Sequence, residues 1–316
     1  MALTTLPTAA FASGSVGTAQ LADSSVTANK VSADLNFRNY VINGDLSVWQ
    51  RGTLFTNAAS GTFTADRWCM SYRAIGNADI TQVDNKTYKS LKVNNSNGSA
   101  QEIAMRYRVE DVTQFNNNSF ILSFYAKAST SVTLDTRVYE NYGSGGSATV
   151  TVVSAGSQNK TITTTRQRFT ISFTTSDMSG KTIGSSNYLE FSFHPTLASG
   201  QNWEFDSVQL EKGTVVSDFE NVPYDVNLDR CYRYFFKQSS QTGQGYQSNV
   251  NDQYRRFTIF YSVPMRTSPS VSNTVWGPTG TPGSQYVTTT SFQMYNYYGN
   301  TTTEGSPLTY TLDAEL

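Results

Sequence analysis

The segment QEIAMRYRVE, residues 101–110, alternates apolar and charged side chains with a period of two. The residues fall into two sets, Ile103, Met105, Tyr107 and Val109 against Glu102, Arg106, Arg108 and Glu110. Because successive side chains of a strand point to opposite faces, the segment predicts a β-strand with one buried face and one solvated face. Strands of this kind belong to antiparallel sheets.

Three later segments repeat the alternation. Their apolar sets are Val132, Leu134 and Val138, then Phe169, Ile171 and Phe173, then Leu189, Phe191 and Phe193. Turn-forming stretches rich in Gly, Asn and Ser separate the segments, for example NNSNGSA at 94–100 and NYGSGGSA at 141–148. Short strands between such turns predict a β-sandwich, and we expect a jelly roll over residues 37–225.

The region after the jelly roll shows a second β-pattern. The stretch YDVNLDRCYRYFFKQ at 224–238 fits both helical spacing and alternation, so it predicts a helical turn that leads into a strand. Phe257, Ile259, Tyr261 and Val263 alternate again before a Tyr-rich end. We therefore expect a smaller C-terminal β-sandwich over residues 226–316, and an all-β fold class for the whole chain.

Residues 1–36 place one large apolar residue at every fifth position, with mostly small side chains between. The series consists of Leu6, Phe11, Val16, Leu21, Val26 and Val31. A spacing of five suits neither a helical face nor a flat strand. Three copies wound about one axis would each present one apolar residue per repeat to the centre. The spacing therefore favours a short trimeric shaft, with Phe11, Val16, Leu21, Val26 and Val31 on the axis, and a disordered linker is the alternative.

The charge balance excludes some classes of protein. Lys plus Arg number 23 and Asp plus Glu number 24, which disfavours a nucleic-acid binder, since such proteins need a basic excess or a basic face. No apolar run approaches the about 18–20 residues that cross a membrane, so we expect no membrane insertion. The first 20 residues lack Lys, Arg and a continuous apolar core, so we expect no signal peptide and synthesis in the cytoplasm. Cys69 and Cys231 are expected as buried thiols.

Catalytic and metal-binding patterns are weak in this sequence. The single histidine, His194, is expected at a strand end on the polar face, as a surface residue. Glu204 and Asp206 share one predicted strand, which is weak support for a glycan-hydrolysing pair. Asp45 and Asp206 are the carboxylates to consider for calcium, but a turn at Asp45 and a satisfied polar group at Asp206 explain them as well. We expect no enzyme, no cofactor and no metal.

Five blocks of the sequence resemble bacteriophage tail-fibre and receptor-binding proteins. They are NYVINGDLSVWQRGT (39–53), TADRW (64–68), WEFDSVQLEKGTVVSDFENVPY (203–224), RCYRYF (230–235) and VPMRTSP (263–269). The first three are similar to the carbohydrate-binding-module-like jelly roll of those fibres, and the last two to the small distal tip domain that often follows it. The N-terminal repeat resembles shaft repeats.

The resemblance implies a homotrimer in the virion. Its N-terminus would attach to the phage tail, on the baseplate or an adaptor protein, and its C-terminal end would meet a host surface polysaccharide or lipopolysaccharide. The resemblance brings no catalytic residues with it. Two alternatives remain: a structural tail component whose jelly roll packs against its neighbours, and a glycan-degrading tailspike, whose long β-helix repeat is not found here.

Aromatic residues are the main candidates for glycan binding, because their faces stack on the C–H surfaces of sugars while amides and hydroxyls bind sugar hydroxyls. Trp49, Trp68 and Trp203 lie in the blocks above and are expected in the core. The C-terminal aromatics lie among Gly, Asn, Gln and Pro, as in exposed loops. The expected ligand-binding residues are Tyr246, Tyr254, Arg255, Trp276, Tyr286, Tyr295, Tyr297 and Tyr298. Packing at the trimer axis or in the small core is the alternative for these aromatics, and a solvated edge is the alternative for Arg255.

Overall fold

The computed structural model describes residues 37–72, 78–242, 253–275, 281–298 and 307–316. The series expected on a trimer axis, Phe11, Val16, Leu21, Val26 and Val31, lies outside these residues, so the trimeric shaft stays a prediction. Tyr246 and Trp276 also lie outside them. The fold is all-β: helix α1 (Tyr224–Tyr232) and the 3₁₀ turn Val112–Phe115 are the helical elements of the described residues.

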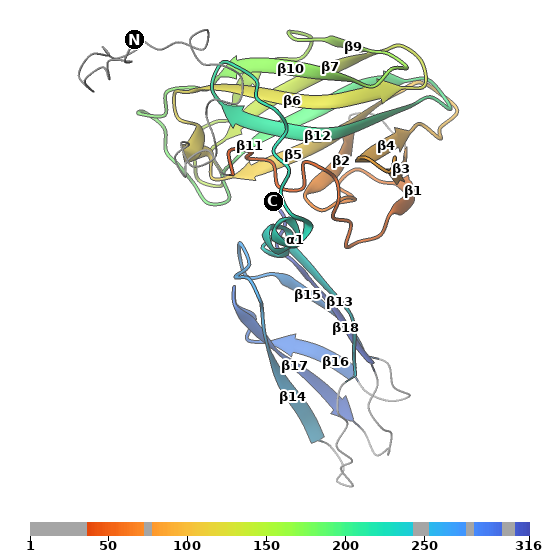
Figure 1. The fold of residues 1–316 in the computed structure, drawn as a ribbon. Coiled ribbons are helices and arrows are strands. Elements are labelled where there is room, and N and C mark those ends of the chain that lie inside the picture. The colour runs from red at the N-terminus through yellow and green to blue at the C-terminus, as the bar shows by residue number, and fades with distance from the viewer. Residues whose placement is uncertain (1–36, 73–77, 243–252, 276–280, 299–306) are drawn as a thin grey trace, which may run out of the picture. The chain divides into compact units, whose positions relative to one another are not determined.

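The first part of the chain forms a jelly-roll β-sandwich of two antiparallel sheets, seen as two layers in Figure 1. Its strands are β1 (Leu54–Ala58), β2 (Trp68–Tyr72), β3 (Ala78–Asp84), β4 (Lys89–Asn94), β5 (Gln101–Glu110), β6 (Ser119–Ala128), β7 (Val132–Asn141), β8 (Val150–Val153), β9 (Lys160–Ile162), β10 (Gln167–Thr174), β11 (Tyr188–Leu197) and β12 (Asn202–Lys212). One sheet has the order β1-β3-β4-β12-β6-β10. The other has the order β2-β5-β11-β7-β8, with β9 paired to β7.

The core between the two sheets is built from the apolar side of each alternating segment. On β11, Leu189, Phe191 and Phe193 are fully buried, as the alternation predicts. The Phe193 ring packs edge-on against Trp203, with ring centroids 5.9 Å apart. Trp68 and Trp203 are also fully buried, which confirms their expected place in the core, and Trp49 packs against the core while half-buried. Burial of a large side chain stabilises the fold by roughly 1.5–3 kcal/mol.

Helix α1 leads into the second sandwich. It ends at Tyr232 and strand β13 (Phe235–Thr242) begins three residues later, so the helical turn and strand predicted for 224–238 are confirmed. Asp225 in the first turn and Arg230 in the last turn match the helix dipole. Cys231 is buried on this helix, and both Cys69 and Cys231 are free buried thiols, as expected.

The second sandwich has two three-stranded antiparallel sheets, β13-β18-β15 and β14-β17-β16. The remaining strands are β14 (Gln253–Phe260), β15 (Ser270–Val275), β16 (Thr281–Gln285), β17 (Ser291–Tyr298) and β18 (Pro307–Asp313). Its own core contains Met265, Phe292, Met294, Tyr310, Leu312 and Ala314. Strand β14 ends at Phe260, so the alternation expected to continue through Val263 stops earlier than predicted.

The two hydrophobic cores are separate along the chain. The buried residues of the first lie between 41 and 210, and those of the second lie between 265 and 314. The expected domain boundary between residues 225 and 226 falls within helix α1. Within the described residues, no helix combines the length and apolarity that a membrane crossing needs.

Candidate functional site

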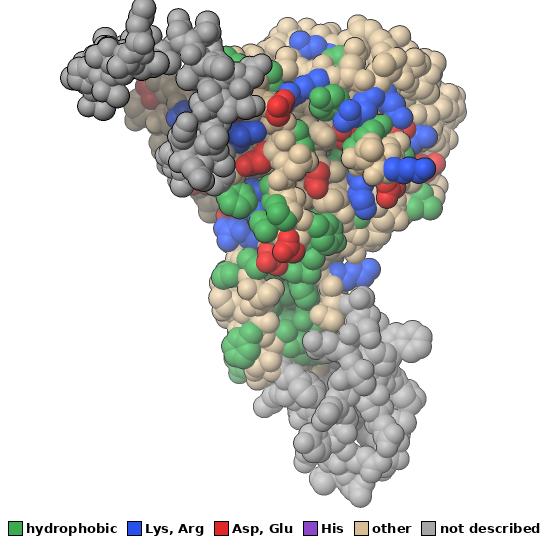
Figure 2. Space-filling model, viewed as in Figure 1, with side chains coloured by type: hydrophobic (Ala, Val, Ile, Leu, Met, Phe, Trp, Pro, Cys, Tyr) green, Lys and Arg blue, Asp and Glu red, His purple; other side chains and the backbone are tan. Residues whose placement is uncertain are grey.

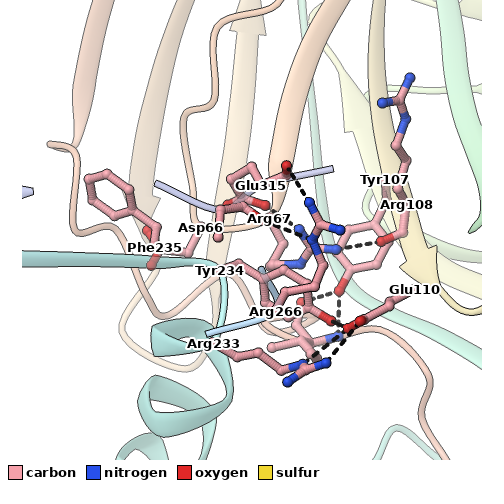
Figure 3. A network of polar contacts seen from close by, with 12 residues as sticks. Asp66, Arg67, Tyr107, Arg108, Glu110, Arg233, Tyr234, Phe235, Arg266 and Glu315 are labelled. Atoms are coloured by element: carbon pink, nitrogen blue, oxygen red, sulfur yellow. Dashed lines mark hydrogen bonds and ion pairs between the residues drawn. The ribbon is translucent and has the colours of Figure 1, made fainter. Parts of the chain in front are cut away.

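Residues from three of the sequence blocks that carry the phage resemblance, 64–68, 230–235 and 263–269, meet where the two sandwiches join (Figure 3). Arg67 of the TADRW block lies with its guanidinium over the ring of Tyr234, 3.5 Å from the ring centroid. Arg67 also pairs with Glu315, which follows β18, and donates to the carbonyl of Arg108 at 2.6 Å. The Arg67 and Glu315 side chains are 2% and 3% exposed, so this ion pair is buried.

Further ionic contacts surround this pair. Arg51 lies over the ring of Phe235, 3.5 Å from its centroid, and pairs with Asp313 at 3.2 Å and with Glu315 at 3.4 Å. On the side of α1, Glu110 accepts two hydrogen bonds from Arg233, at 3.0 and 2.8 Å. The hydroxyl of Tyr234 donates a third to Glu110, at 2.8 Å. These contacts lie within the chain itself and join the two sandwiches.

Asp66 is a carboxyl group of this junction whose pKa is shifted. Burial raises the pKa of its carboxyl from 3.8 to about 6, while a hydrogen bond from Gln50 and the charge of Arg51 oppose the rise. Burial likewise raises the pKa of the Cys231 thiol, which keeps that sulfur protonated. Sequence reasoning missed this junction, although the charged residues Asp66 and Arg67 directly before the core tryptophan Trp68 were a signal for it.

His194 is not the surface residue at a strand end that the sequence predicts. Strand β11 continues past it to Leu197, and its side chain is only 11% exposed. Its Nδ1 lies 2.9 Å from Glu102 Oε1, and its Nε2 lies 2.8 Å from Ser192 Oγ. The polar face was predicted correctly, but Glu102 of β5 and Ser192 of β11 itself lie against the ring. Burial first, and the charge of Arg137 second, lower the pKa of His194.

The carboxylates considered for calcium or hydrolysis have protein partners. Asp206 accepts two hydrogen bonds from Arg166, at 2.9 and 2.5 Å, and the Arg166 guanidinium lies between the rings of Tyr88 and Tyr125. Glu204 pairs with Lys127 at 3.3 Å. Asp45 accepts from Asn227 at 2.8 Å, within a turn. Among the residues with a described position, no cluster of three or more His, Cys, Asp or Glu side chains is arranged to hold a metal.

The predicted ligand-binding residues lie mainly on one sheet of the second sandwich. Tyr254 and Arg255 are on β14 and Tyr297 and Tyr298 are on β17, with Tyr254 directly opposite Tyr297. Their side chains fall outside the described part of the structure. Tyr286 and Tyr295 are the predicted residues whose side chains are described, and they lie at the end of β16 and on β17.

Tyr295 lies on the outer face of this sheet. Phe292 and Met294 point into the core, so the alternate residues Gln293 and Tyr295 point away from it. Gly283 on β16 is the residue opposite Tyr295, and a Cβ there would lie 2.3 Å from Cζ of the tyrosine ring. The ring therefore reaches across the sheet and covers Gly283, as aromatic residues often cover glycines on edge strands.

Polar and apolar side chains share this face with Tyr295. Gln285 Nε2 donates to Gln293 Oε1 at 2.5 Å. Phe260 is opposite Ser291, which places it on the same face, and it is 77% exposed. We call Phe260, Gln285, Gln293 and Tyr295 the outer face of β17. An aromatic ring beside a pair of amides is the combination that binds a sugar ring.

Tyr286 stands beside this face at the end of β16. It is 76% exposed, and its backbone has φ of 52°, in the left-handed region that a bulky non-glycine residue rarely adopts. Backbone strain of this kind is common at functional sites. Figure 2 shows hydrophobic side chains on both sides of the junction between the sandwiches, and Lys, Arg, Asp and Glu scattered over the first sandwich.

A groove of about 250 Å³ opens in the second sandwich near the edges formed by β13 and β14. Its lining comes from three separate segments: Tyr232, Phe236 and Gln238; Ile259, Phe260, Tyr261, Ser262, Val263 and Met265; Tyr310 and Leu312. Sequence reasoning missed the groove because packing alone brings these segments together. The aromatic pair Phe260-Tyr261 was the one local signal for it.

No family model matches the sequence, and no curated protein matches it. Similar solved structures include the N-terminal cellulose-binding domain of Cellulomonas fimi β-1,4-glucanase C, at 21% identity over 47% of this chain and 90% of that chain, with a TM-score of 0.33. The family 11 carbohydrate-binding module of Clostridium thermocellum gives 13% identity over 52% and 98%, with a TM-score of 0.34. The enzymatically active domain of bacteriophage CBA120 tailspike protein 4 gives 15% over 56% and 22%, with a TM-score of 0.36. At TM-scores this low, the similarities say nothing about what this chain binds.

Proposed function

We propose that this chain is a bacteriophage tail-fibre protein that binds a host surface glycan through its C-terminal sandwich. In this proposal residues 1–36 form a trimeric shaft that attaches to the phage tail, and the protein works in the virion. The protein acts by binding and carries out no reaction. The resemblance of the five sequence blocks to receptor-binding fibres supports the phage role.

The outer face of β17 is the observation that supports glycan binding most directly. The end of the Tyr295 ring lies over Gly283, so an aromatic side chain occupies this part of the sheet surface. The electron-rich face of such a ring attracts the C–H groups of a sugar. The amides of Gln285 and Gln293 supply both donors and acceptors for sugar hydroxyls next to that ring.

In a trimer, weak single sites would be sufficient to hold the particle on a polysaccharide. Three copies of the outer face of β17 on one particle would bind a repetitive polysaccharide together, so the avidity can exceed the single-site affinity by about 10²–10⁴. A surface site suits this mode, because each contact can be weak and reversible while the particle stays attached.

An array of purified bacterial polysaccharides and lipopolysaccharides, probed with the full chain, tests the glycan role. We expect binding to a subset of the array, and a loss of at least tenfold in the Tyr295→Ala variant. Tyr224→Ala is the matched control, because Tyr224 is 56% exposed on α1, away from the proposed face. If the Tyr295→Ala variant binds as well as the unchanged chain, the glycan site lies elsewhere in the protein. If the unchanged chain binds no glycan, the structural tail component is favoured.

Sedimentation equilibrium of the full chain tests the trimer separately. We expect three times the chain mass of 34.8 kDa, and the mass of one chain in a double variant Leu21→Asp, Val26→Asp. Charged side chains at two positions of the series cannot be buried on an axis without a large cost. A single-chain mass for the unchanged protein would support the linker alternative for residues 1–36.

A further inference from the structure

We infer that residues 213–223, which connect β12 to α1, form a contact surface between copies of this chain. We call this segment the strap. Each strap is covered by a neighbouring copy, so the copies touch there as well as along residues 1–36. The choice of a second copy as the partner rests on the trimer of the proposed function.

The strap lies over the outer face of the sheet that contains β6, β10 and β12, and Figure 1 draws it in front of β6 and β12. Ser217 N donates to Glu211 Oε1 of β12 at 2.9 Å. The carbonyl of Ser217 accepts from Arg168 of β10. Glu220 N donates to Gln209 Oε1 of β12 at 2.8 Å. These polar groups of the strap therefore turn toward the sheet.

The large apolar side chains of the strap are not part of the core. They are Val215, Val216, Phe219 and Val222. None of the four belongs to the hydrophobic core of the first sandwich, none is fully buried, and Val215 is 80% exposed. A segment that turns polar groups inward and leaves apolar side chains in water gains stability when another surface covers those side chains.

The strap lies beside Asn39, close to where residues 1–36 continue into the first sandwich. Glu220 Oε2 accepts a hydrogen bond from the backbone N–H of Asn39 at 2.9 Å. Tyr40 N donates to the carbonyl of Leu210 at 2.9 Å, two residues before the end of β12. Asn39 is therefore held between the end of β12, where the strap starts, and the second half of the strap.

In a trimer held by residues 1–36, the three copies of Asn39 lie round one axis. The chain from Val31, the last residue of the series expected on that axis, to Asn39 spans at most about 28 Å when fully extended. The surface beside Asn39 is therefore turned toward the neighbouring copies, and it carries the exposed side chain of Val215. A three-fold axis makes the contact heterologous, so each strap meets a different surface of the next copy.

Maleimide labelling of a Val215→Cys variant tests whether a second copy covers the strap. The labelling rate in the full chain is compared with the rate in the same chain that also carries Leu21→Asp and Val26→Asp, which is expected as a single chain. We expect the thiol at position 215 to react at least tenfold more slowly in the trimer, because a neighbouring copy excludes the reagent.

Leu54→Cys is the matched control for this measurement. Leu54 is 62% exposed on β1, which is three strands away from β12 in the same sheet. A thiol at position 54 should react at the same rate in the trimer and in the single chain. The natural thiols Cys69 and Cys231 are buried, so the unchanged chain gives the background of the measurement.

Equal labelling rates at position 215 in a chain that sediments as a trimer overturn the inference and leave the trimeric shaft standing. Protection that arises only on phage particles also overturns it, since the strap would then contact a tail protein. If the unchanged chain sediments with the mass of one chain, the inference and the trimer of the proposed function both fail.

Discussion

The guanidinium of Arg67 pairs with the carboxylate of Glu315 at the junction of the two sandwiches, and both side chains are almost completely buried. The two residues are 248 positions apart in the sequence. Arg233 and Glu110 pair on the α1 side of the same junction. The second sandwich is therefore tied to the first by residues that precede its first strand and by residues that follow its last strand.

The Glu315→Gln variant should lose about 3–5 kcal/mol of unfolding free energy, because it leaves Arg67 as a buried charge without its main counter-ion. Asp313→Asn is the matched control, since Asp313 is 41% exposed and its pair with Arg51 should contribute less than about 1 kcal/mol. Urea titration of each variant measures the difference. Similar small losses in both variants would show that Glu315 does not compensate Arg67.

The local sequence pattern predicted burial and secondary structure correctly where a residue's neighbours in the sequence determine its environment. The alternation of Phe191 and Phe193 predicted their complete burial, and the mixed periodicity of residues 224–238 predicted a helix followed by a strand. Both inferences rest on side-chain direction along a single element, which the spacing of apolar residues sets directly.

The local sequence pattern did not predict contacts between segments that are far apart in the sequence. Pro195 suggested the end of a strand at His194, but pairing with β5 resumes at Thr196 opposite Glu102, and this neighbour covers the imidazole. Tyr261 fitted an ordinary alternating strand, and its place in a groove depends on α1, β13 and β18 packing beside it. Sequence spacing carries no signal for such packing.

The Asp66 carboxyl should titrate with a pKa of about 6, because burial outweighs the stabilising charge of Arg51. The raised value means that the folded state holds this proton more tightly than the unfolded state does. The contribution of Asp66 to stability is therefore complete below pH 3.8 and is lost as the pH rises through about 6. In the Arg51→Gln variant the pKa should rise further, since the opposing charge is gone.

Carbon-detected NMR titration of the carboxyl groups measures this shift. Asp177 serves as an internal control in the same spectra, because hydrogen bonds from Ser179 lower its pKa. A pKa for Asp66 at or below 3.8 in the unchanged protein would contradict the prediction.

His194 should remain neutral to a lower pH than an ordinary histidine, because burial and the Arg137 charge lower its pKa below 6.5. The unfolded state then takes up the proton first, so the stability due to this residue is complete above pH 6.5 and is lost as the pH falls through the folded-state pKa. Removing the cation in Arg137→Gln should raise the pKa, while Glu102→Gln should lower it further. Proton NMR of the imidazole distinguishes the two directions, and shifts of equal sign would contradict the assigned charges.

The Gly283→Ala variant should displace the Tyr295 ring, because the added methyl group would lie 2.3 Å from its Cζ atom. Gly283 does not have a positive φ, so alanine can adopt its backbone conformation. The substitution therefore tests only the space above the glycine. The ring must move to make room for the methyl group, which changes the aromatic surface of the outer face of β17. Glycan-array binding should therefore fall about as far as in the Tyr295→Ala variant.

Gly180→Ala is the matched control for this substitution, since a Cβ at Gly180 meets no atom within 4 Å. Circular dichroism and the unfolding temperature should show both variants folded, with a cost of about 1–3 kcal/mol expected for Gly283→Ala from the crowded ring. Full glycan binding in a folded Gly283→Ala protein would mean that the orientation of Tyr295 over Gly283 does not matter for recognition. The aromatic surface would then have to be sought at Phe260, which is 77% exposed on the same face.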